Sequence, residues 1–553
     1  MWVHEDATGL LLEKQYADHA QQDPRNTEYT YENDGRLKQR SWSRSQGQGR
    51  LVTEYSYGTA PGSSPADLIE IEYSDGTPGV EFTYNRLGRI ATVTDAVGIR
   101  IFTYDPGGLH LLSEELISIY YNNKLITRKY DSAAGVVGRV TGFQVGTFGS
   151  PDQYYDTTYT YDALGRLEKV FGPGLDSTHG VAYTRLEESS ANTSDMVEHV
   201  AFKSDTNDTL AGSQRLPVSS RDLLDYVENK VDTTTISKYD YYLDTLGRRE
   251  AVVHTGSAFT SHLLNYTYND RSELTVADRR EGTDPSSPGN PTAAPHDWDY
   301  VYDPIGNRDT FTLDGGTATT YADNSVNQYT ATTGGQSASF GYDFDGNLTS
   351  DDAFAYVWDG ENRLSRIVTK REGQPQAGDR KLDYAYDYMS RRVEKKYSVH
   401  NGSDWVVQSI QRFVYDQWNV VLVLDGTDGN AVQTKYTWGL DMSGLAGDAT
   451  AQGIHGAGGI GGLLAAVETG GANAGTYWFL YDGNGNVGQV LDATDTQSIA
   501  VAARYEYDPF GRLIVTAGDY ADANPFRASP DVEAAGSPSW RSRDACWRTH
   551  GRC

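Results

Sequence analysis

Apolar and polar residues alternate along most of this chain, in short stretches separated by turns. Thr160 lies between Tyr159 and Tyr161, and after the next turn Leu167 and Val170 stand among charged residues. Alternation with a period of two, in stretches rich in Tyr, Thr, Val and Phe, is typical of β-strands. The pattern therefore predicts strand, turn and strand, repeated along the chain.

The turns carry a recurring phrase: Tyr-Asp, two or three variable residues, Gly, then Arg or Asn, then an apolar residue. Asp accepts hydrogen bonds from the backbone just ahead of it, and Gly adopts the positive φ that the turn requires. A repeated phrase predicts a repeated structural unit. The clear copies contain Tyr161, Asp162, Gly165 and Arg166; Tyr302, Asp303 and Gly306; Tyr342, Asp343 and Gly346; and Tyr507, Asp508, Gly511 and Arg512, and looser copies begin at Tyr31, Tyr84, Tyr104, Tyr242, Trp358, Tyr386 and Tyr481.

A single hairpin is marginally stable in water, so the repeats must stack on one another. Aromatic landmarks at Tyr302, Tyr321, Tyr342 and Trp358 follow one another after 19, 21 and 16 residues, which indicates a variable repeat. The chain has 39 Tyr against 15 Phe, and Tyr suits a sheet that is wet on one face. We predict an all-β fold in which repetitive β-hairpins form a large spiralling sheet, with its completeness at the C-terminus left open.

The net charge of −29 argues against nucleic-acid binding, which needs a basic surface. Such acidity favours solubility, and it also suits a basic partner. The two cysteines, Cys546 and Cys553, lie at the very end of the chain, and no apolar run is long enough to span a membrane. The first residues lack the basic and apolar regions of a signal peptide, so export needs another signal or the reading frame starts inside a larger one.

Composition divides the chain into five parts. Repeats fill residues 1–172 and 236–437, and residues 173–235 are expected to be an irregular insertion or decayed repeats, with a short helix near Arg221 to Tyr226. Residues 438–527 begin with a Gly-rich segment and end in a well-formed repeat pair. The tail, 528–553, loses Tyr and gains Trp, Arg and Cys, which favours a truncated or frameshifted end over a genuine variable tip.

The Tyr-Asp repeats resemble those of the RHS/YD-repeat family, and residues 438–527 resemble the start of its RHS repeat-associated core. The version found here is similar to that of RHS proteins from planctomycete-like environmental bacteria. The resemblance covers most of residues 25–527. The core residues are Trp438, Gly439, Leu440 and Asp441, then Gly458, Gly459, Gly461 and Gly462, and finally Asn524, Pro525, Phe526 and Arg527.

The resemblance implies a β-sheet shell, secreted or displayed at the cell surface, that encloses or presents a C-terminal toxin or effector domain. Wall association and a dependence on secretion machinery are implied in the same way. In the family the core ends at an Asp-Pro-x-Gly motif, where many members cut themselves through aspartates. The Asp-Pro segments at 105–108, 303–306 and 508–511 lie inside repeat turns, so we do not assign them to self-cleavage. We therefore expect the effector to be absent from this chain or to lie elsewhere.

Motifs that would indicate an enzyme or a cofactor site are weak. The Gly-x-Gly-x-x-Gly match at 456–461 lacks the flanking strand and helix of a dinucleotide site. Asp343, Asp345 and Asn347 resemble a calcium loop, but its Gly and closing Glu are misplaced, so a hydrogen-bonded turn is favoured. The zinc-protease and esterase signatures do not occur. We therefore assign no catalytic, cofactor-binding or metal-binding residue, and predict a protein that is not an enzyme.

Two other functions stay open. Abundant Tyr and Trp would suit a surface or wall-associated adhesion module that binds carbohydrate or a neighbouring cell, although cross-strand pairing explains most of these residues. A glycosidase would need two carboxylates spaced for acid–base work, and the many Asp and Glu residues of the turns do not single out a pair. The toxin-delivery shell leads, with the adhesion module as its alternative.

Overall fold

The computed structural model describes residues 2–15, 26–46, 49–58, 62–132, 138–150, 153–188, 192–218, 223–441 and 459–527. Within these ranges all regular elements are β-strands. They form two sheets, of 27 and 14 strands. The all-β fold class predicted from the alternating sequence is confirmed.

The first sheet fills the N-terminal three-fifths of the chain. Its strands are β1 (Trp2–His4), β2 (Leu11–Gln15), β3 (Asn26–Tyr31), β4 (Leu37–Gln46), β5 (Gly49–Tyr57), β6 (Leu68–Tyr73), β7 (Val80–Tyr84), β8 (Ile90–Asp95), β9 (Gly98–Tyr104), β10 (Leu111–Ile117), β11 (Lys124–Tyr130), β12 (Val140–Thr147), β13 (Gln153–Tyr161), β14 (Leu167–Phe171), β15 (Val181–Glu188), β16 (Asn192–Lys203), β17 (Thr209–Val218), β18 (Leu223–Val231), β19 (Thr234–Leu243), β20 (Arg249–Thr255), β21 (His262–Tyr268), β22 (Leu274–Glu281), β23 (Asp297–Tyr302), β24 (Arg308–Leu313), β25 (Thr319–Asp323), β26 (Tyr329–Gly334) and β27 (Ala338–Ser339).

The second sheet follows directly. Its strands are β28 (Gly341–Tyr342), β29 (Leu348–Ser350), β30 (Phe354–Trp358), β31 (Leu364–Thr369), β32 (Arg380–Tyr386), β33 (Arg392–His400), β34 (Trp405–Asp416), β35 (Asn419–Asp425), β36 (Ala431–Trp438), β37 (Leu463–Glu468), β38 (Gly475–Tyr481), β39 (Val487–Asp492), β40 (Ala500–Tyr507) and β41 (Leu513–Ala517).

Each strand pairs antiparallel with its neighbours in the sequence, so both sheets are meanders of hairpins. The register shifts at the motif Tyr: Thr160 pairs with Lys169, but Tyr161 pairs with Leu167, which leaves Glu168 as an extra residue. The same shift recurs at other repeats, including those that end at Tyr302, Tyr386 and Tyr507. A bulge bends its strand and increases its twist, so one bulge per repeat curves the sheet.

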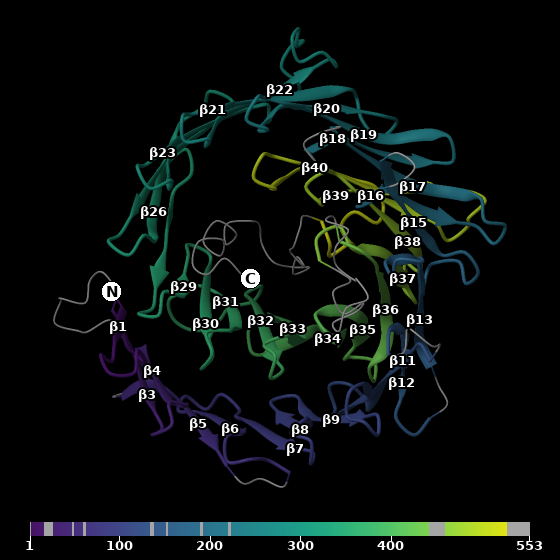
Figure 1. The fold of residues 1–553 in the computed structure, drawn as a ribbon. Helices are drawn as coiled ribbons and strands as arrows, with labels where there is room; N and C mark the ends of the chain where they lie inside the picture. The colour runs from purple at the N-terminus through teal and green to yellow at the C-terminus, as the bar shows by residue number, and fades with distance from the viewer. Residues whose placement is uncertain are drawn as a thin grey trace.

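The curved sheets wind into a spiral, in which the first sheet forms an outer turn and the second an inner turn (Figure 1). Strand β36 lies against β13, and β38 lies against β17 and β18. Residues separated by almost three hundred positions therefore meet: the Tyr155 hydroxyl donates to the backbone carbonyl of Tyr436 at 2.9 Å. The predicted spiralling sheet is confirmed.

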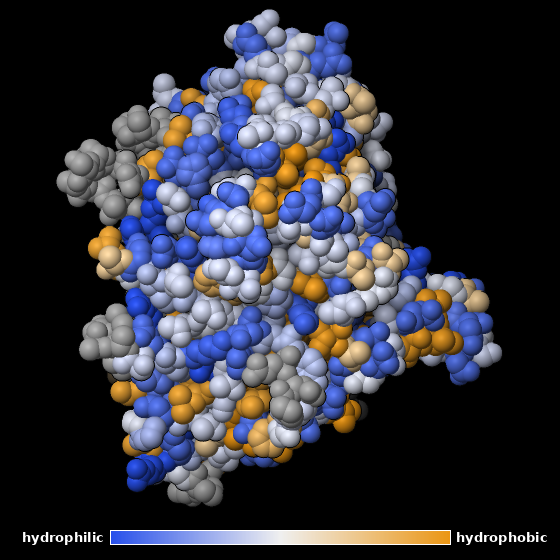
Figure 2. All heavy atoms as spheres, turned by 90° about the vertical axis from the view of Figure 1, so that its right-hand side faces the viewer, coloured by the Kyte–Doolittle hydropathy of each residue, from blue (hydrophilic) through white to orange (hydrophobic). Residues whose placement is uncertain are grey.

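Strands β35, β37, β38 and β39 of the inner turn bury residues on both of their faces. Leu422 and Leu424 pack with outer-turn residues such as Val145 and Val170 in one apolar core between the turns. Val423, between the two leucines, points the other way and belongs to a second cluster, which contains inner-turn residues and lies on the concave side of the spiral. Alternation along a strand thus supplies both clusters. The other face of the outer turn is exposed to solvent. Figure 2 shows this surface as largely hydrophilic, with scattered hydrophobic patches.

Residues 173–235 hold strands β15 to β18, which continue the sheet. The short helix expected near Arg221 to Tyr226 is wrong, because Leu223–Val231 is β18 and pairs with β17 and β19. Alternation from Tyr226 onward, with Val227 and Asn229 buried, outweighs the helix-forming Leu pair. Gly458 and the tail, with Cys546 and Cys553, lie outside the described residues. None of the described residues forms a helix long and apolar enough to cross a membrane.

The motif glycine supplies a first prediction. Gly165 has a φ of +85°, and at the equivalent turn positions Asn362 and Ser390 have φ values of +58° and +61°. Replacing Gly165 by Val should lower the free energy of unfolding by about 1–2 kcal/mol or more, because a β-branched residue disfavours this conformation. Gly165→Asn is the matched control and should lose less. Urea unfolding of the two variants tests this, and equal losses would contradict it.

Candidate functional site

The motif turn is closed by its own aspartate. Oδ1 of Asp162 accepts the backbone N–H groups of Leu164 and Arg166, each at 2.9 Å, and Oδ2 accepts Nε of Arg166 at 2.7 Å. Burial opposes ionisation of this carboxyl, but the hydrogen bonds from Arg166 outweigh it, so the pKa of Asp162 is below its ordinary value. Gly165 donates its N–H to the Asp162 carbonyl at 3.0 Å.

The other clear copies are built in the same way. Asp303, Asp343 and Asp508 each accept the backbone N–H two residues and four residues ahead. Gly306, Gly346 and Gly511 each donate their N–H to the carbonyl of the motif Asp. Desolvation raises the pKa of Asp508, although the backbone N–H of Arg512 opposes the shift. The aspartates are therefore engaged by their own turns.

The motif tyrosine ties each hairpin to the one before it. The Tyr161 hydroxyl donates to the carbonyl of Val140, the first residue of the neighbouring strand β12, at 2.6 Å. Tyr302 and Tyr507 reach the neighbouring strand in the same way, and Tyr342 of the second sheet reaches Tyr329, the first residue of β26 in the first sheet. Where Trp438 replaces Tyr, its indole N–H donates to the Val420 carbonyl at 2.7 Å. The sequence analysis did not predict this hydrogen bond. Tyr and Trp both carry a polar donor at the tip of the ring, and their interchange at this position could have indicated it.

A buried network of charged side chains joins the outer and inner turns of the spiral. From the outer turn, Arg100 contacts Glu114 and reaches Asp387 of the inner turn at 3.2 Å. Arg128 of the outer turn lies 3.6 Å from Glu114 and 2.8 Å from Asp416 of the inner turn. Burial opposes ionisation of Glu114, but Arg100 and Arg128 outweigh it and lower its pKa. Asp387 is itself a motif aspartate, so this repeat turn also holds the inner turn of the spiral against the outer turn.

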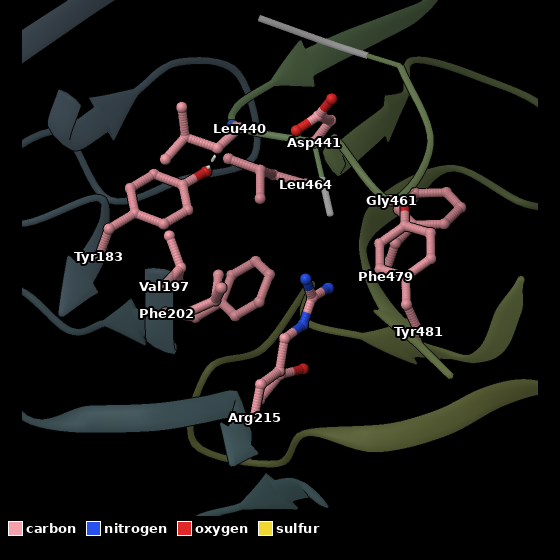
Figure 3. Close-up of a pocket in the computed structure, with 12 residues that line it drawn as sticks. Tyr183, Val197, Phe202, Arg215, Leu440, Asp441, Gly461, Leu464, Phe479 and Tyr481 are labelled. Atoms are coloured by element: carbon pink, nitrogen blue, oxygen red, sulfur yellow. Dashed lines mark hydrogen bonds between the residues drawn. The ribbon is translucent and has the colours of Figure 1, made fainter. Parts of the chain in front are cut away.

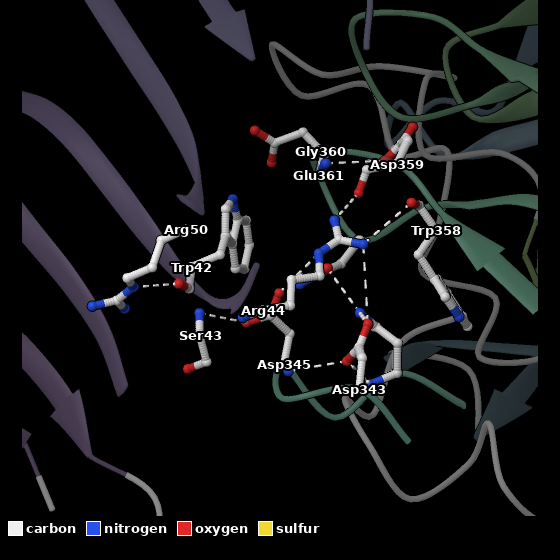
Figure 4. Close-up of polar contacts among 12 residues, drawn as sticks. Trp42, Ser43, Arg44, Arg50, Asp343, Asp345, Trp358, Asp359, Gly360 and Glu361 are labelled. Carbon is white, nitrogen blue, oxygen red and sulfur yellow. Dashed lines mark hydrogen bonds and ion pairs between the residues drawn. The ribbon is translucent and has the colours of Figure 1, made fainter. Parts of the chain in front are cut away.

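A second anchor lies where the inner turn begins (Figure 4). Oδ1 of Asp345 accepts the N–H of Ser43 at 2.8 Å, and its Oδ2 lies 3.0 Å from Nε of Arg44, both on β4 of the outer turn. Asn347 donates its side-chain N–H to Asp343 at 2.9 Å. The carboxylates of the calcium-like sequence are therefore occupied by donors from the protein itself, and not arranged around an ion. Among the described residues, no three His, Cys, Asp or Glu side chains are grouped to hold a metal ion.

Tyrosines of the outer turn also contact the backbone of the inner turn, and Figure 3 shows one of them, Tyr183, beside Leu440. The Tyr183 hydroxyl accepts the N–H of Leu440 at 3.1 Å, and a Cβ on Gly439 would lie only 1.9 Å from that oxygen. Tyr241 accepts the N–H of Gly483 at 2.6 Å in the same manner. The Trp-Gly-Leu-Asp segment thus requires glycine because the outer turn approaches so closely.

The remaining core residues fall into two groups. Gly439 donates to the carbonyl of Gly462 at 2.8 Å, and Gly462 donates to that of Gly459 at 3.1 Å, which fixes the Gly-rich turn. Asp441 and Gly461 line a cavity of about 20 Å³ together with Tyr183 and Arg215 from the outer turn. This cavity is too small for a ligand, and it lies in the seam, the interface between the outer and inner turns of the spiral.

The second group, Asn524 to Arg527, folds back over the concave face. The Phe526 ring packs edge-on against Tyr436 and Trp438, with centroids 5.0 and 5.8 Å apart. Buried Asn524 accepts the N–H of Phe526 at 2.9 Å. The Arg527 carbonyl accepts the backbone N–H of Val487 at 3.0 Å. Pro525 lies between these contacts, so the chain is held on the inside of the spiral.

No family model matches the chain. A protein of Bacillus spizizenii named tRNA3(Ser)-specific nuclease WapA is 29% identical over 233 residues, and tRNA nuclease WapA of Bacillus subtilis is 27% identical over 233 residues. Each match covers 41% of this chain and 8% of the relative, so the chain spans under a tenth of those proteins. These relatives support the resemblance to RHS-repeat proteins.

Among solved structures, the crystal structure of TcdB2-TccC3-TEV has a TM-score of 0.39 and 14% identity, covering 97% of this chain and 32% of that chain. The crystal structure of TcdB2-TccC3-Cdc42 has a TM-score of 0.38 and 13% identity, covering 94% of this chain and 31% of that chain.

The glycine contact at Tyr183 yields a double-mutant test. Gly439→Ala should destabilise the chain by about 1–3 kcal/mol, because the added methyl group overlaps the Tyr183 hydroxyl. Combining it with Tyr183→Phe removes the oxygen and should recover part of the loss. Thermal unfolding of the four chains gives the coupling, and strictly additive losses would contradict the contact.

The charge network predicts a pH dependence. Glu114→Gln should lower the free energy of unfolding by about 3–5 kcal/mol at pH 7, since it leaves two arginines without their carboxylate. Because the folded chain lowers the pKa of Glu114, its contribution is complete above the ordinary value of 4.5 and is lost as the pH falls through the folded value. Urea midpoints of the two chains should converge below about pH 4.5.

The control is Glu115→Gln, on the same strand but the opposite face. It should change the urea midpoint much less at pH 7. A gap between wild type and Glu114→Gln that stays constant down to pH 3 would refute the electrostatic origin of the effect.

Proposed function

We propose that this chain is the non-enzymatic β-shell of a secreted or cell-surface RHS/YD-repeat protein that delivers a toxin in contact-dependent competition. One observation carries the proposal. The chain returns to the concave face at Asn524 to Arg527, where Phe526 packs on Tyr436 and Trp438. Polypeptide that follows Arg527 therefore sets out from the inside of the spiral, which is where an enclosed effector belongs.

The chemistry of the turns supports a structural role. Asp482 and Asp508 are half-buried carboxyls whose pKa values are raised by desolvation, a shift of the kind that acid–base catalysis uses. Both, however, accept backbone N–H groups of their own turns, as Asp162 and Asp303 do. Their perturbation follows from closing a buried repeat turn. A non-enzymatic shell accounts for them without a further assumption.

The relatives support the wider setting. The two WapA proteins are named tRNA nucleases, and the part that this chain matches is under a tenth of either. We infer that the matched part corresponds to shell and that an effector domain, lying elsewhere in the full protein, is the main partner. Secretion machinery, surface carbohydrate and a planctomycete-like source remain parts of this proposal that rest on the sequence resemblance.

The test is protection of a fused passenger. An unstructured, protease-sensitive passenger attached after Cys553 should survive a protease that removes the same passenger attached before Trp2, an exposed residue of the outer turn. The physical reason is that the chain leading to the first passenger leaves the described structure at Arg527, on the concave face, whereas the second passenger joins an exposed end of the outer turn. Limited proteolysis followed by mass spectrometry measures both half-lives.

Equal cleavage of the two passengers would refute the shell. Binding of the chain to a glycan array, in the absence of protection, would support the alternative, an adhesion module at the cell surface.

A further inference from the structure

A pocket of about 270 Å³ opens on the concave face of the inner turn. Strands β33 to β37 form its floor, the turn at 470–473 forms one wall, and Pro525 and Phe526 form another. The pocket faces away from the outer turn, since its lining residues Phe413, Val423 and Tyr436 belong to the cluster made of inner-turn residues. It lies beside the point at which the chain reaches the inside of the spiral.

A bulge directs two basic side chains into this pocket. Ala385 pairs with Glu394 and Tyr386 pairs with Arg392, so Val393 is an extra residue in β33. Val393 packs in the core between the turns. Because two bulge residues share one side of a strand, Arg392 and Lys395 both face the concave side despite their odd spacing. Both line the pocket.

Glu394 confirms this orientation, since it points the other way. Its carboxylate accepts Nε of Arg412 at 2.8 Å, and Arg412 donates to the carbonyl of Ile119 on the outer turn, also at 2.8 Å. Strand β33 therefore directs the acidic Glu394 towards the outer turn and the basic Arg392 and Lys395 into the pocket.

The charge of the pocket is opposite to that of the chain. Besides the two cations, its ionisable lining includes Glu468, whose pKa burial raises and whose oxygens accept the hydroxyls of Thr434 at 2.7 Å and Tyr520 at 2.8 Å. Burial, and secondarily Arg392, lowers the pKa of Lys395 to about 8, so its amine is still mainly charged at neutral pH. In a protein of net charge −29, this site attracts anions.

The other walls suit a peptide. Phe413, Val423 and Phe526 offer an apolar surface beside the cations. The carboxamides of Gln411 and Gln433 also line the pocket, and in the described part of the chain neither takes part in a hydrogen bond. A carboxamide offers one acceptor and two donors, which match the C=O and N–H groups of an extended backbone.

We propose that this pocket binds an extended segment of the enclosed polypeptide at an acidic side chain next to a large apolar one. The carboxylate lies between Lys395 and Arg392, and the apolar side chain rests on Phe413 and Phe526. The proposal rests on the proposed shell function and adds a sequence preference to it: acidic, apolar segments are held at the wall and basic ones are not.

The test uses the full chain with passengers fused after Cys553. One passenger carries repeated Phe-Glu pairs in a Gly-Ser background, and its matched partner carries Phe-Gln pairs. A photo-crosslinking amino acid replaces Gln433, which is exposed at the pocket. We expect the Phe-Glu passenger to crosslink about tenfold more than the Phe-Gln passenger, the effect of one charge-assisted hydrogen bond.

Variants of the lysine pair separate binding from folding. Lys395→Met should abolish the difference between the passengers, and Lys395→Arg should keep it. Lys396→Met is the control, because Lys396 faces the other side of β33 and lies 3.9 Å from Asp383. Each chain should show the same thermal unfolding midpoint within a few degrees, so that a loss of crosslinking reports on the pocket.

The same samples distinguish the two proposals. Equal crosslinking of both passengers, or equal effects of Lys395→Met and Lys396→Met, would overturn the pocket proposal while protease protection of the passengers still supported the shell. Loss of protection for every passenger would overturn the shell and, with it, the pocket.

Discussion

The structure depends on one local arrangement, the motif turn with its tyrosine. A β-hairpin leaves backbone donors at its turn and carbonyls at its strand ends, and buried groups of this kind must find partners. The aspartate satisfies the turn, and the tyrosine hydroxyl satisfies a carbonyl at the start of the neighbouring strand. One short phrase therefore closes a hairpin and fastens it to the preceding one. Repeated along the chain, it produces a ribbon that curves because each copy also inserts a bulge.

The spiral solves a second problem, which is how a long meander buries its apolar face. A sheet of this length exposes one face unless something covers it, and here the inner turn covers the outer turn with Leu422, Leu424 and their neighbours. Polar contacts accompany the apolar core. Buried ion pairs such as Arg128 with Asp416 cost desolvation, so we infer that they fix which repeats face each other more than they add to net stability. Close approaches such as Tyr183 on Gly439 fix the same register sterically.

The concave face differs in character from the seam. Its apolar residues are covered in part by the returning segment that ends at Arg527, and beside that segment lies a pocket with two basic side chains. Strand β33 thus directs Glu394 towards the outer turn and Arg392 and Lys395 towards the interior. A wall of this kind would hold an unfolded, acidic and apolar polypeptide by contacts made at its surface, without a fitted binding site for any one folded domain.

The amino-acid sequence by itself determined the strands, the turns and the all-β class, because alternation and the Asp-x-x-Gly turn act over a few residues. It failed at Arg221 to Tyr226, where a short helical pattern yielded to pairing with strands on both sides. Only the tertiary structure decided which residues of the outer and inner turns meet. Asp345 belongs to a calcium-like phrase in the sequence, but its donors, Ser43 and Arg44, come from about three hundred residues away. Spacing along the chain carries no information on such meetings, because they are set by how far the sheet curves in one full turn. The pocket follows the same logic: one extra residue, Val393, brings Arg392 and Lys395 to one side.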